Sequence, residues 1–165
     1  LPIGVGQTLS PPYVMARMLQ ELKLSDGARV LEVGTGSGYQ AALLSNMAEH
    51  VYTVEVLPEL SARARKVLGD DLELTNVSFR ASDGFQGWSD EAPFSAIIVN
   101  AVADEVPWPL KGQLRGPGRL VMPVGDAREQ TLQVWERKRT GQDLNLVYEE
   151  PIEYPFGPMV GEAVE

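Results

Sequence analysis

The stretch at residues 30–39, VLEVGTGSGY, restricts the fold of this chain more than any other. Its first half is short, largely apolar and rich in β-branched residues, as expected of a strand that is buried on both faces of a parallel sheet. Three glycines at alternate positions follow, and a helical pattern starts at Gln40. Strand, glycine loop and helix in this order predict the first unit of a nucleotide-binding α/β fold, because the backbone there must turn sharply and approach a ligand more closely than a Cβ would permit.

The spacing of the glycines favours one class of ligand. A dinucleotide fingerprint reads G-x-G-x-x-G, whereas Gly34, Gly36 and Gly38 give G-x-G-x-G. Glu32 precedes the loop, and a carboxylate there disfavours a pyrophosphate but favours a ligand with a sulfonium and an ammonium group. The motif therefore favours S-adenosylmethionine over NAD, although glycine-rich turns of this kind have several uses and some are only tight turns.

Length and composition bound the class of protein. At 165 residues the chain is long enough for one domain with a core and too short for two. It has no cysteine and one histidine, His50, which argues against disulfides, thiol catalysis and any metal site built from these residues. We expect no signal peptide, and no apolar run reaches the roughly 18 residues that cross a bilayer. We therefore expect no metal, no membrane association and a cytoplasmic location.

The charge argues against a nucleic-acid partner. A formal net charge of −9 repels phosphate backbones. One basic run, Arg137-Lys138-Arg139, lies between two expected strands, where a solvated hairpin end is the simpler interpretation. We expect no binding to nucleic acid, and we expect a monomer.

Strand and helix patterns alternate along the rest of the chain. Further strands are expected at residues 50–55, 77–81, 94–99 and 120–124, helices at 11–22, 40–48, 58–68 and 107–114, and a hairpin at 131–137 and 144–148. Ser10 is expected to be the N-cap of the first helix, since Pro11 and Pro12 follow it. The order predicts an α/β fold with a doubly wound, mostly parallel seven-stranded sheet and an antiparallel C-terminal hairpin, in a single domain over residues 1–165. Residues 1–10 are expected to be extended and residues 151–165 irregular.

Polar residues follow several of the expected strands. Glu55 ends one strand, where an acid can accept hydrogen bonds from ribose hydroxyls or can simply face water. Asp83 and Gly84 follow the next strand and suit an adenine ring, or form only a turn. Asn100 follows the fourth strand. Because the carboxyl ends of parallel strands meet at one edge, where such sheets bind ligands, we expect these residues to converge.

Several motifs together resemble the protein-L-isoaspartate O-methyltransferase family. The similarity covers LPIG at residues 1–4, QTLS at 7–10, the stretch at 30–39 with the glycine loop, Asp83-Gly84, IIV at 97–99 and LVMPVG at 120–125, and so runs almost end to end. The glycine loop is shared by many methyltransferases, whereas QTLS is the specific part. The resemblance implies a Rossmann-like fold of the S-adenosylmethionine-dependent methyltransferase type. Family members begin with a helical stretch that is absent before Leu1, and the chain does not start with Met, so we expect residues upstream.

The resemblance also implies a function. The family transfers a methyl group from S-adenosylmethionine, leaving S-adenosylhomocysteine, to the free carboxylate of L-isoaspartyl residues, with D-aspartyl residues as a second candidate, and so starts the repair of damaged proteins and peptides. Residue by residue, it predicts Ser10 as the catalytic residue. It predicts cofactor binding by Gln7, Thr8, Leu9, Ser10, Glu32, Gly34, Thr35, Gly36, Ser37, Gly38, Tyr39, Glu55, Asp83 and Gly84. It predicts substrate binding by Ile3, Ser10, Asn100, Ala101 and Val102.

Such a reaction needs few catalytic groups. A carboxylate is a nucleophile at neutral pH, so no general base is required, and catalysis comes from alignment and the exclusion of water. The hydroxyl of Ser10 suits the task of holding one carboxylate oxygen. Residues 100–102 replace the small-residue run that is usual in the family, which leaves the shape of the substrate pocket open.

Three alternatives stay open. A methyltransferase that uses S-adenosylmethionine on a small molecule would share every motif except residues 7–10. A truncated fragment could bind the cofactor without turnover. A dehydrogenase is a more distant third, given the spacing of the glycines.

Overall fold

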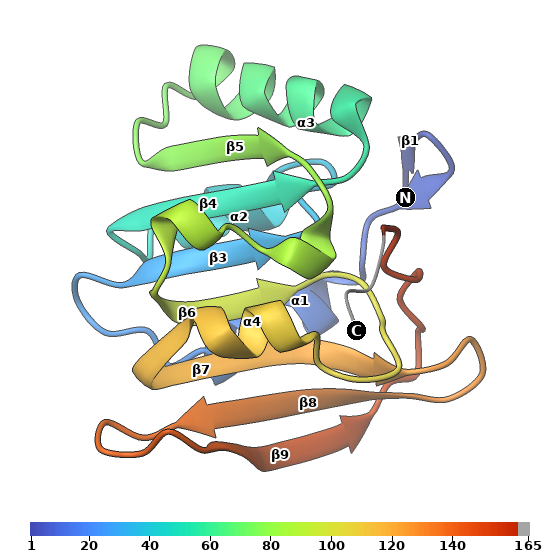
Figure 1. Cartoon of the computed structure of the whole chain (residues 1–165). Helices are drawn as coiled ribbons and strands as arrows, with labels where there is room; N and C mark the ends of the chain where they lie inside the picture. Colours follow the sequence, from blue (N-terminus) through green and yellow to red (C-terminus); the bar gives the residue numbers. More distant parts are fainter. Residues whose placement is uncertain (162–165) are drawn as a thin grey trace.

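A seven-stranded sheet runs through the centre of the computed structural model, which describes residues 1–161 (Figure 1). The strands lie in the order β5-β4-β3-β6-β7-β8-β9. The first five in this order are parallel, and β8 and β9 are antiparallel to their neighbours. Their bounds are β3 (Arg29–Val33), β4 (His50–Glu55), β5 (Val77–Ala81), β6 (Phe94–Val99), β7 (Leu114–Gly125), β8 (Gln130–Arg137) and β9 (Leu144–Pro151). The predicted parallel sheet with a C-terminal antiparallel hairpin is confirmed.

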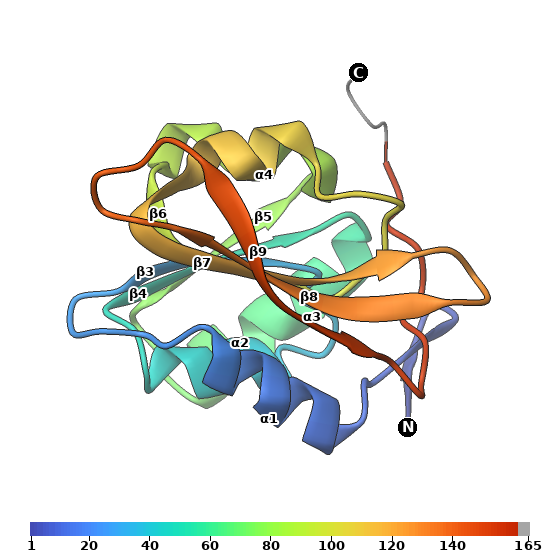
Figure 2. The ribbon, with the colours of Figure 1, turned by 90° about the horizontal axis from the view of Figure 1, so that it is seen from below.

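Helices cover both faces of the sheet, as a doubly wound fold requires. Figure 2 shows α1 (Pro12–Glu21), α2 (Tyr39–Ser45) and α3 (Pro58–Arg65) on one face and α4 (Trp108–Gln113) on the other. A π-helical turn at Lys66–Asp71 extends α3, and short 3-10 turns lie at Gly84–Gln86 and Ser89–Glu91. Within residues 1–161, no helix is both long and apolar enough to span a bilayer.

The core consists of two apolar layers, one on each face of the sheet. Val30 and Ile98 belong to the layer under α1 and α2, whereas their neighbours Leu31 and Ile97 belong to the layer under α4. All four side chains are fully buried. Successive strand residues point to opposite faces, so a central strand needs apolar residues at nearly every position. This explains why the strand before the glycine loop shows no polar alternation.

Residues 1–10 fold back on themselves. They form a two-stranded antiparallel hairpin, β1 (Pro2–Gly4) and β2 (Gln7–Thr8), where the sequence predicted only an extended segment. At the other end of the chain, β9 continues to Pro151, and β7 begins at Leu114 rather than at residue 120. Residues 162–165, which belong to the expected irregular tail and to the expected domain, lie outside the described residues.

The predicted N-cap role of Ser10 is wrong. Pro11 occupies the N-cap position of α1 with ψ of 135°, and no side chain caps this helix. A residue that precedes a proline is disfavoured in the helical conformation, so Pro12 keeps Pro11 extended and the helix begins at Pro12. The side chain of Ser10 is therefore not needed to start the helix.

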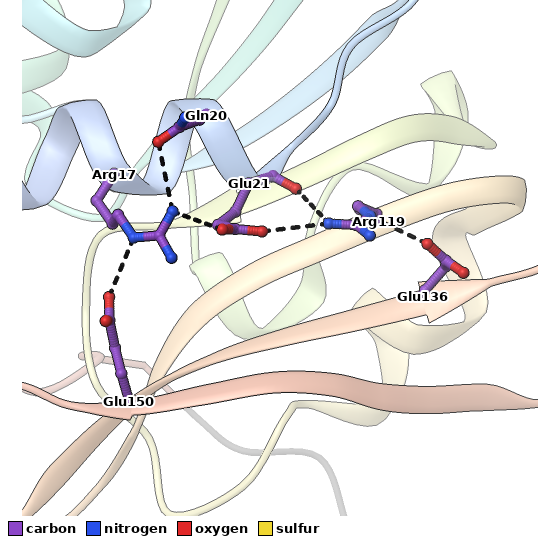
Figure 3. A network of polar contacts seen from close by, with 6 residues as sticks. All are labelled: Arg17, Gln20, Glu21, Arg119, Glu136 and Glu150. Atoms are coloured by element: carbon purple, nitrogen blue, oxygen red, sulfur yellow. Dashed lines mark hydrogen bonds and ion pairs between the residues drawn. The ribbon is translucent and has the colours of Figure 1, made fainter.

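An ion-pair network fastens α1 to the last three strands (Figure 3). Arg119 on β7 lies between Glu21 of α1 and Glu136 of β8, at 3.3 and 3.1 Å. Arg17 of α1 pairs with Glu21 at 2.6 Å and reaches Glu150 on β9 at 3.5 Å. The network therefore holds α1, the helix that follows residues 7–10, on the antiparallel part of the sheet.

Candidate functional site

A cavity of about 590 Å³ lies at the carboxyl edge of the parallel strands. Its floor is formed where β3, β4 and β6 end, and the segment at residues 6–11 provides one wall. The segment at residues 154–160, which follows β9, provides another. The edge predicted to bind a ligand is therefore a partly enclosed site between the two ends of the described chain.

The glycine loop borders this cavity in a conformation that favours glycine. Gly34 has φ of 92° and Gly36 has φ of 55°, both in the region that side chains with a Cβ rarely adopt. A Cβ on Gly34 would lie 3.2 Å from the Cβ of Asn100, and one on Gly36 would lie 3.2 Å from Cδ1 of Ile3. Both neighbours are predicted substrate residues, so the loop lies close to the predicted substrate side of the cavity.

Glu55 ends β4 and fixes the loop. Its Oε2 accepts the backbone N–H of Gly36 at 2.9 Å, and its Oε1 accepts the N–H of Leu57 at 3.1 Å. Glu55 is only 6% exposed, so the alternative that this acid simply faces water is wrong. A carboxylate has about four acceptor sites, so these two bonds leave capacity for hydroxyl groups of a ligand.

Glu32 lies beneath the loop and does not line the cavity. It is fully buried, accepts the hydroxyl of Thr53 at 2.5 Å and contacts the amide nitrogen of Asn100 at 3.4 Å. Burial raises the pKa of Glu32 to about 8, the charge of Glu55 adds to the rise, and the two hydrogen bonds oppose it. At neutral pH this acid is largely protonated, so it does not present a free carboxylate to a cationic ligand.

Asn100 and Gln40 form an amide pair in the cavity wall. The Nδ2 of Asn100 donates to Oε1 of Gln40 and, at 3.1 Å, to the carbonyl of Gly34. Among residues 1–161, Nε2 of Gln40 and Oδ1 of Asn100 are buried without a hydrogen-bond partner. A buried open donor beside a buried open acceptor is costly unless a ligand or water satisfies both. The pair suits a ligand that carries both an acceptor and a donor, such as an α-amino acid group.

Most of the predicted site residues lie in the cavity wall. Those that line it are Gln7, Thr8, Leu9, Ser10, Gly34, Thr35, Gly36, Ser37, Glu55 and Gly84 from the predicted cofactor set, and Ile3, Asn100 and Ala101 from the predicted substrate set. Their binding roles stay predictions.

Five predicted residues do not line the cavity, and each has another position. Glu32, described above, is the first of them. Gly38 is the N-cap of α2 and packs against Leu68, and Tyr39 is exposed on the same helix. Val102 is buried, and its backbone binds the segment after β9. Asp83 accepts the N–H of Phe85 at 2.9 Å and is covered by Gly161.

Two parts of the site were not predicted. The sequence pattern predicts Gln40 only as the start of a helix. Because Gln40 lies two residues after Gly38, it lies beside the carboxyl edge of the sheet and lines the cavity. Residues 154–160 were interpreted as an irregular tail, and their composition of proline, glycine and apolar residues gives no periodicity to detect. Among residues 1–161, no group of three acidic, histidine or cysteine side chains is arranged to hold a metal ion.

A family model described as protein-L-isoaspartate(D-aspartate) O-methyltransferase matches residues 1–161. The chain belongs to this family. The protein-L-isoaspartate O-methyltransferase of Anaeromyxobacter dehalogenans strain 2CP-C is 55% identical over 142 residues, which cover 86% of this chain and 68% of that protein. The protein of the same name from Aeromonas hydrophila is 50% identical over 165 residues, which cover 100% of this chain and 78% of that protein.

Solved structures agree with the isoaspartate methyltransferase family. One protein-L-isoaspartate O-methyltransferase superposes with a TM-score of 0.81 at 30% identity, covering 95% of this chain and 50% of that one, so this chain spans half of its length. A putative family member from Plasmodium falciparum, solved with S-adenosyl-L-homocysteine, has a TM-score of 0.72 at 24% identity and covers 97% of this chain and 79% of that one. The second similarity shows the fold alone.

Proposed function

We propose that this chain transfers the methyl group of S-adenosylmethionine to the free carboxylate of L-isoaspartyl residues in damaged proteins and peptides. One observation carries the proposal beyond family membership. The QTLS segment at residues 7–10, the specific part of the family pattern, and the glycine loop, its generic methyltransferase part, line the same cavity. A methyl donor on the loop and a substrate on residues 7–10 would therefore share one enclosed space.

The residues in the cavity wall fit the methyl donor. Glu55 keeps acceptor capacity for ribose hydroxyls, and the backbone turns at Gly34 and Gly36 leave room that a Cβ would fill. The open amide groups of Gln40 and Asn100 suit its amino acid end. When bound, S-adenosylmethionine supplies a methyl group on a positively charged sulfur. Because Glu32 is protonated and lies outside the wall, it acts by holding Thr53 and Asn100 in place.

Ser10 is the side chain that we propose to hold the substrate. It is half-buried and lines the cavity, and none of the hydrogen bonds found within residues 1–161 uses its hydroxyl. That hydroxyl can donate to one oxygen of the isoaspartyl carboxylate while the other oxygen attacks the methyl group. No proton has to be removed from the nucleophile, so the site needs no general base.

The cavity also keeps water away from the reacting groups. Apolar side chains of Met15, Leu60 and Phe156 line it, and all three are largely buried. A carboxylate that loses part of its hydration becomes a stronger nucleophile, because its charge is no longer stabilised by solvent. Exclusion of water therefore adds to the effect of alignment.

The alternatives are less well supported. A small-molecule methyltransferase would not need the QTLS segment, which the family match over residues 1–161 includes. A fragment without turnover is the second candidate, because the chain covers 68% and 78% of the two curated relatives described above and half of one solved relative. The monomeric state and the cytoplasmic location stay predictions.

Incubation of the chain with S-adenosylmethionine and a synthetic isoaspartyl peptide, followed by mass spectrometry, tests the proposal. The expected product is a peptide with one added methyl group, and the same peptide with a normal aspartyl residue is the matched control. A chain that binds S-adenosylhomocysteine but methylates neither peptide would be a cofactor-binding fragment. A chain that methylates both peptides equally would not be specific for isoaspartyl residues.

A further inference from the structure

Residues 154–161, here called the strap, cross the carboxyl edge of the sheet after β9. In Figure 1 the chain leaves β9 and runs past the strand ends toward the N-terminal hairpin. Most of the strap lines the cavity, including Phe156, Met159 and Val160. It is therefore part of the wall of the site.

The first half of the strap is held firmly. Gln130 is only 5% exposed, and its Oε1 accepts the N–H of Phe156 at 2.8 Å while its Nε2 donates to the carbonyl of Phe156 at 3.0 Å. The backbone N–H of Val102 donates to the carbonyl of Gly157 at 2.9 Å, and its carbonyl accepts the N–H of Met159 at 2.8 Å, where the second half of the strap begins. The phenyl ring of Phe156 is buried.

The second half covers the residues predicted to bind adenine. A Cβ on Gly161 would lie 2.0 Å from Oδ1 of Asp83, so the backbone of Gly161 lies directly against that carboxyl group. Cε of Met159 is 3.5 Å from where a Cβ on Gly84 would stand. Asp83 is absent from the cavity wall, whereas Gly84 is part of it. The strap thus fills the space beside Asp83 that a ligand would need.

We propose that the strap is a movable cover. When the adenine end of the cofactor binds, the hydrogen bond from the N–H of Met159 to the carbonyl of Val102 opens and residues 159–161 leave Asp83 and Gly84, while Phe156 stays on Gln130. The inference rests on the proposed function, because it takes the adenine to lie beside Asp83. A Cβ on Gly161 would lie 2.0 Å from Oδ1 and 2.6 Å from Oδ2 of Asp83, so Gly161 and an adenine amino group would compete for this carboxyl group. Exposure locates the moving part, since Phe156 is 8% exposed and Val160 is 57% exposed.

Gly161→Ala tests the cover directly. Gly161 has φ of 143°, where alanine is strained, and the added methyl would collide with Asp83, so the substitution favours the open strap. Association of S-adenosylhomocysteine, measured by stopped-flow fluorescence, should then accelerate by roughly 5-fold or more, because the open fraction limits binding. If Gly161 instead contributes to a fixed wall, the variant should bind more weakly with an unchanged association rate.

A second variant tests the hinge. Gln130→Ala removes both bonds to Phe156, so association and dissociation of S-adenosylhomocysteine should both become faster. Gln133→Ala is the matched control, because this glutamine lies on the same strand and bonds to Glu149 on the exposed side. Amide hydrogen exchange keeps the proposal testable if Gln130→Ala unfolds. In the wild-type chain, ligand should speed exchange at Met159 and leave Phe156 protected.

The possible outcomes distinguish a failure of the strap proposal from a failure of the proposed function on which it rests. If neither the wild-type chain nor Gly161→Ala binds S-adenosylhomocysteine, the proposed function fails, and the strap proposal fails with it. If both bind at the same rate, and exchange at Met159 does not rise with ligand, the strap proposal alone is overturned. Binding that appears only in Gly161→Ala, or is faster there, supports it.

Discussion

The Glu55 carboxylate accepts the backbone N–H of Gly36 at 2.9 Å, which joins the end of β4 to the glycine loop that ends β3. The same carboxylate accepts the N–H of Leu57, so one side chain organises both segments that border the cofactor side of the cavity. This acid therefore has a structural role in addition to the predicted contact with ribose.

Glu55→Ala should weaken the binding of S-adenosylhomocysteine and also lower stability. Loss of hydrogen bonds to a charged acceptor should cost about 1.5–3 kcal/mol of binding free energy. Because two partly buried N–H groups also lose their acceptor, the melting temperature should fall as well. Isothermal titration calorimetry and thermal unfolding measure the two effects. Unchanged affinity in a folded variant would contradict the ribose assignment.

Ser10 variants should change activity and leave stability almost unchanged, because Ser10 does not cap α1. Ser10→Ala should lower kcat/KM for an isoaspartyl peptide by about 10-fold or more, since a hydrogen bond to a charged group is lost. Ser10→Thr keeps a donor and should retain part of the activity. Ser10→Asp should abolish methylation, because its carboxylate repels that of the substrate. A folded and fully active Ser10→Asp variant would remove Ser10 from the mechanism.

Glu32 should make stability depend on pH. The folded chain holds the proton of Glu32 up to about pH 8, whereas the unfolded chain releases it near pH 4.5. The stabilisation is therefore complete below about pH 4.5 and is lost as the pH rises through about 8. Relative to wild type, the free energy of unfolding of Glu32→Gln should rise by about 1–4 kcal/mol over this window. Urea titrations at several pH values measure the difference, and a difference that stays constant with pH would refute the prediction.

Arg119→Ala should destabilise the chain through α1. The variant leaves Glu21 and Glu136, which Arg119 now bridges, without their common cation. Since these groups are mostly buried, the free energy of unfolding should fall by about 1.5–3 kcal/mol, and it can be measured by urea denaturation. Arg115→Ala, at an exposed position on the same strand, is the matched control. Equal stability of the two variants would show that the network contributes nothing.

Much of the fold could be predicted because its signals are local. The strand before the glycine loop is buried on both faces and reads as an apolar run, and the alternation of strand and helix patterns implies a parallel sheet. The polar residues at strand ends converge because carboxyl ends of parallel strands share an edge. The start of α1 is also a local effect, since Pro12 restricts Pro11 and the helix begins two residues after Ser10.

The rest depends on contacts between distant residues. The strap is fixed by Gln130 and Val102, which lie far from it in sequence, and its own composition shows no periodicity. The protonation of Glu32 depends on burial beneath a loop and on the groups around it, which a linear motif does not reveal. The same holds for Gln40, whose pairing with Asn100 joins α2 to the end of β6.

The most direct test of the proposed activity is the transfer of a deuterated methyl group from labelled S-adenosylmethionine to an isoaspartyl peptide, with the modified group located by fragmentation in the mass spectrometer. We predict that the label appears on the free carboxylate of the isoaspartyl residue, that the aspartyl peptide stays unlabelled, and that Ser10→Asp gives no product. A label on another group, or equal labelling of both peptides, would contradict the proposed function.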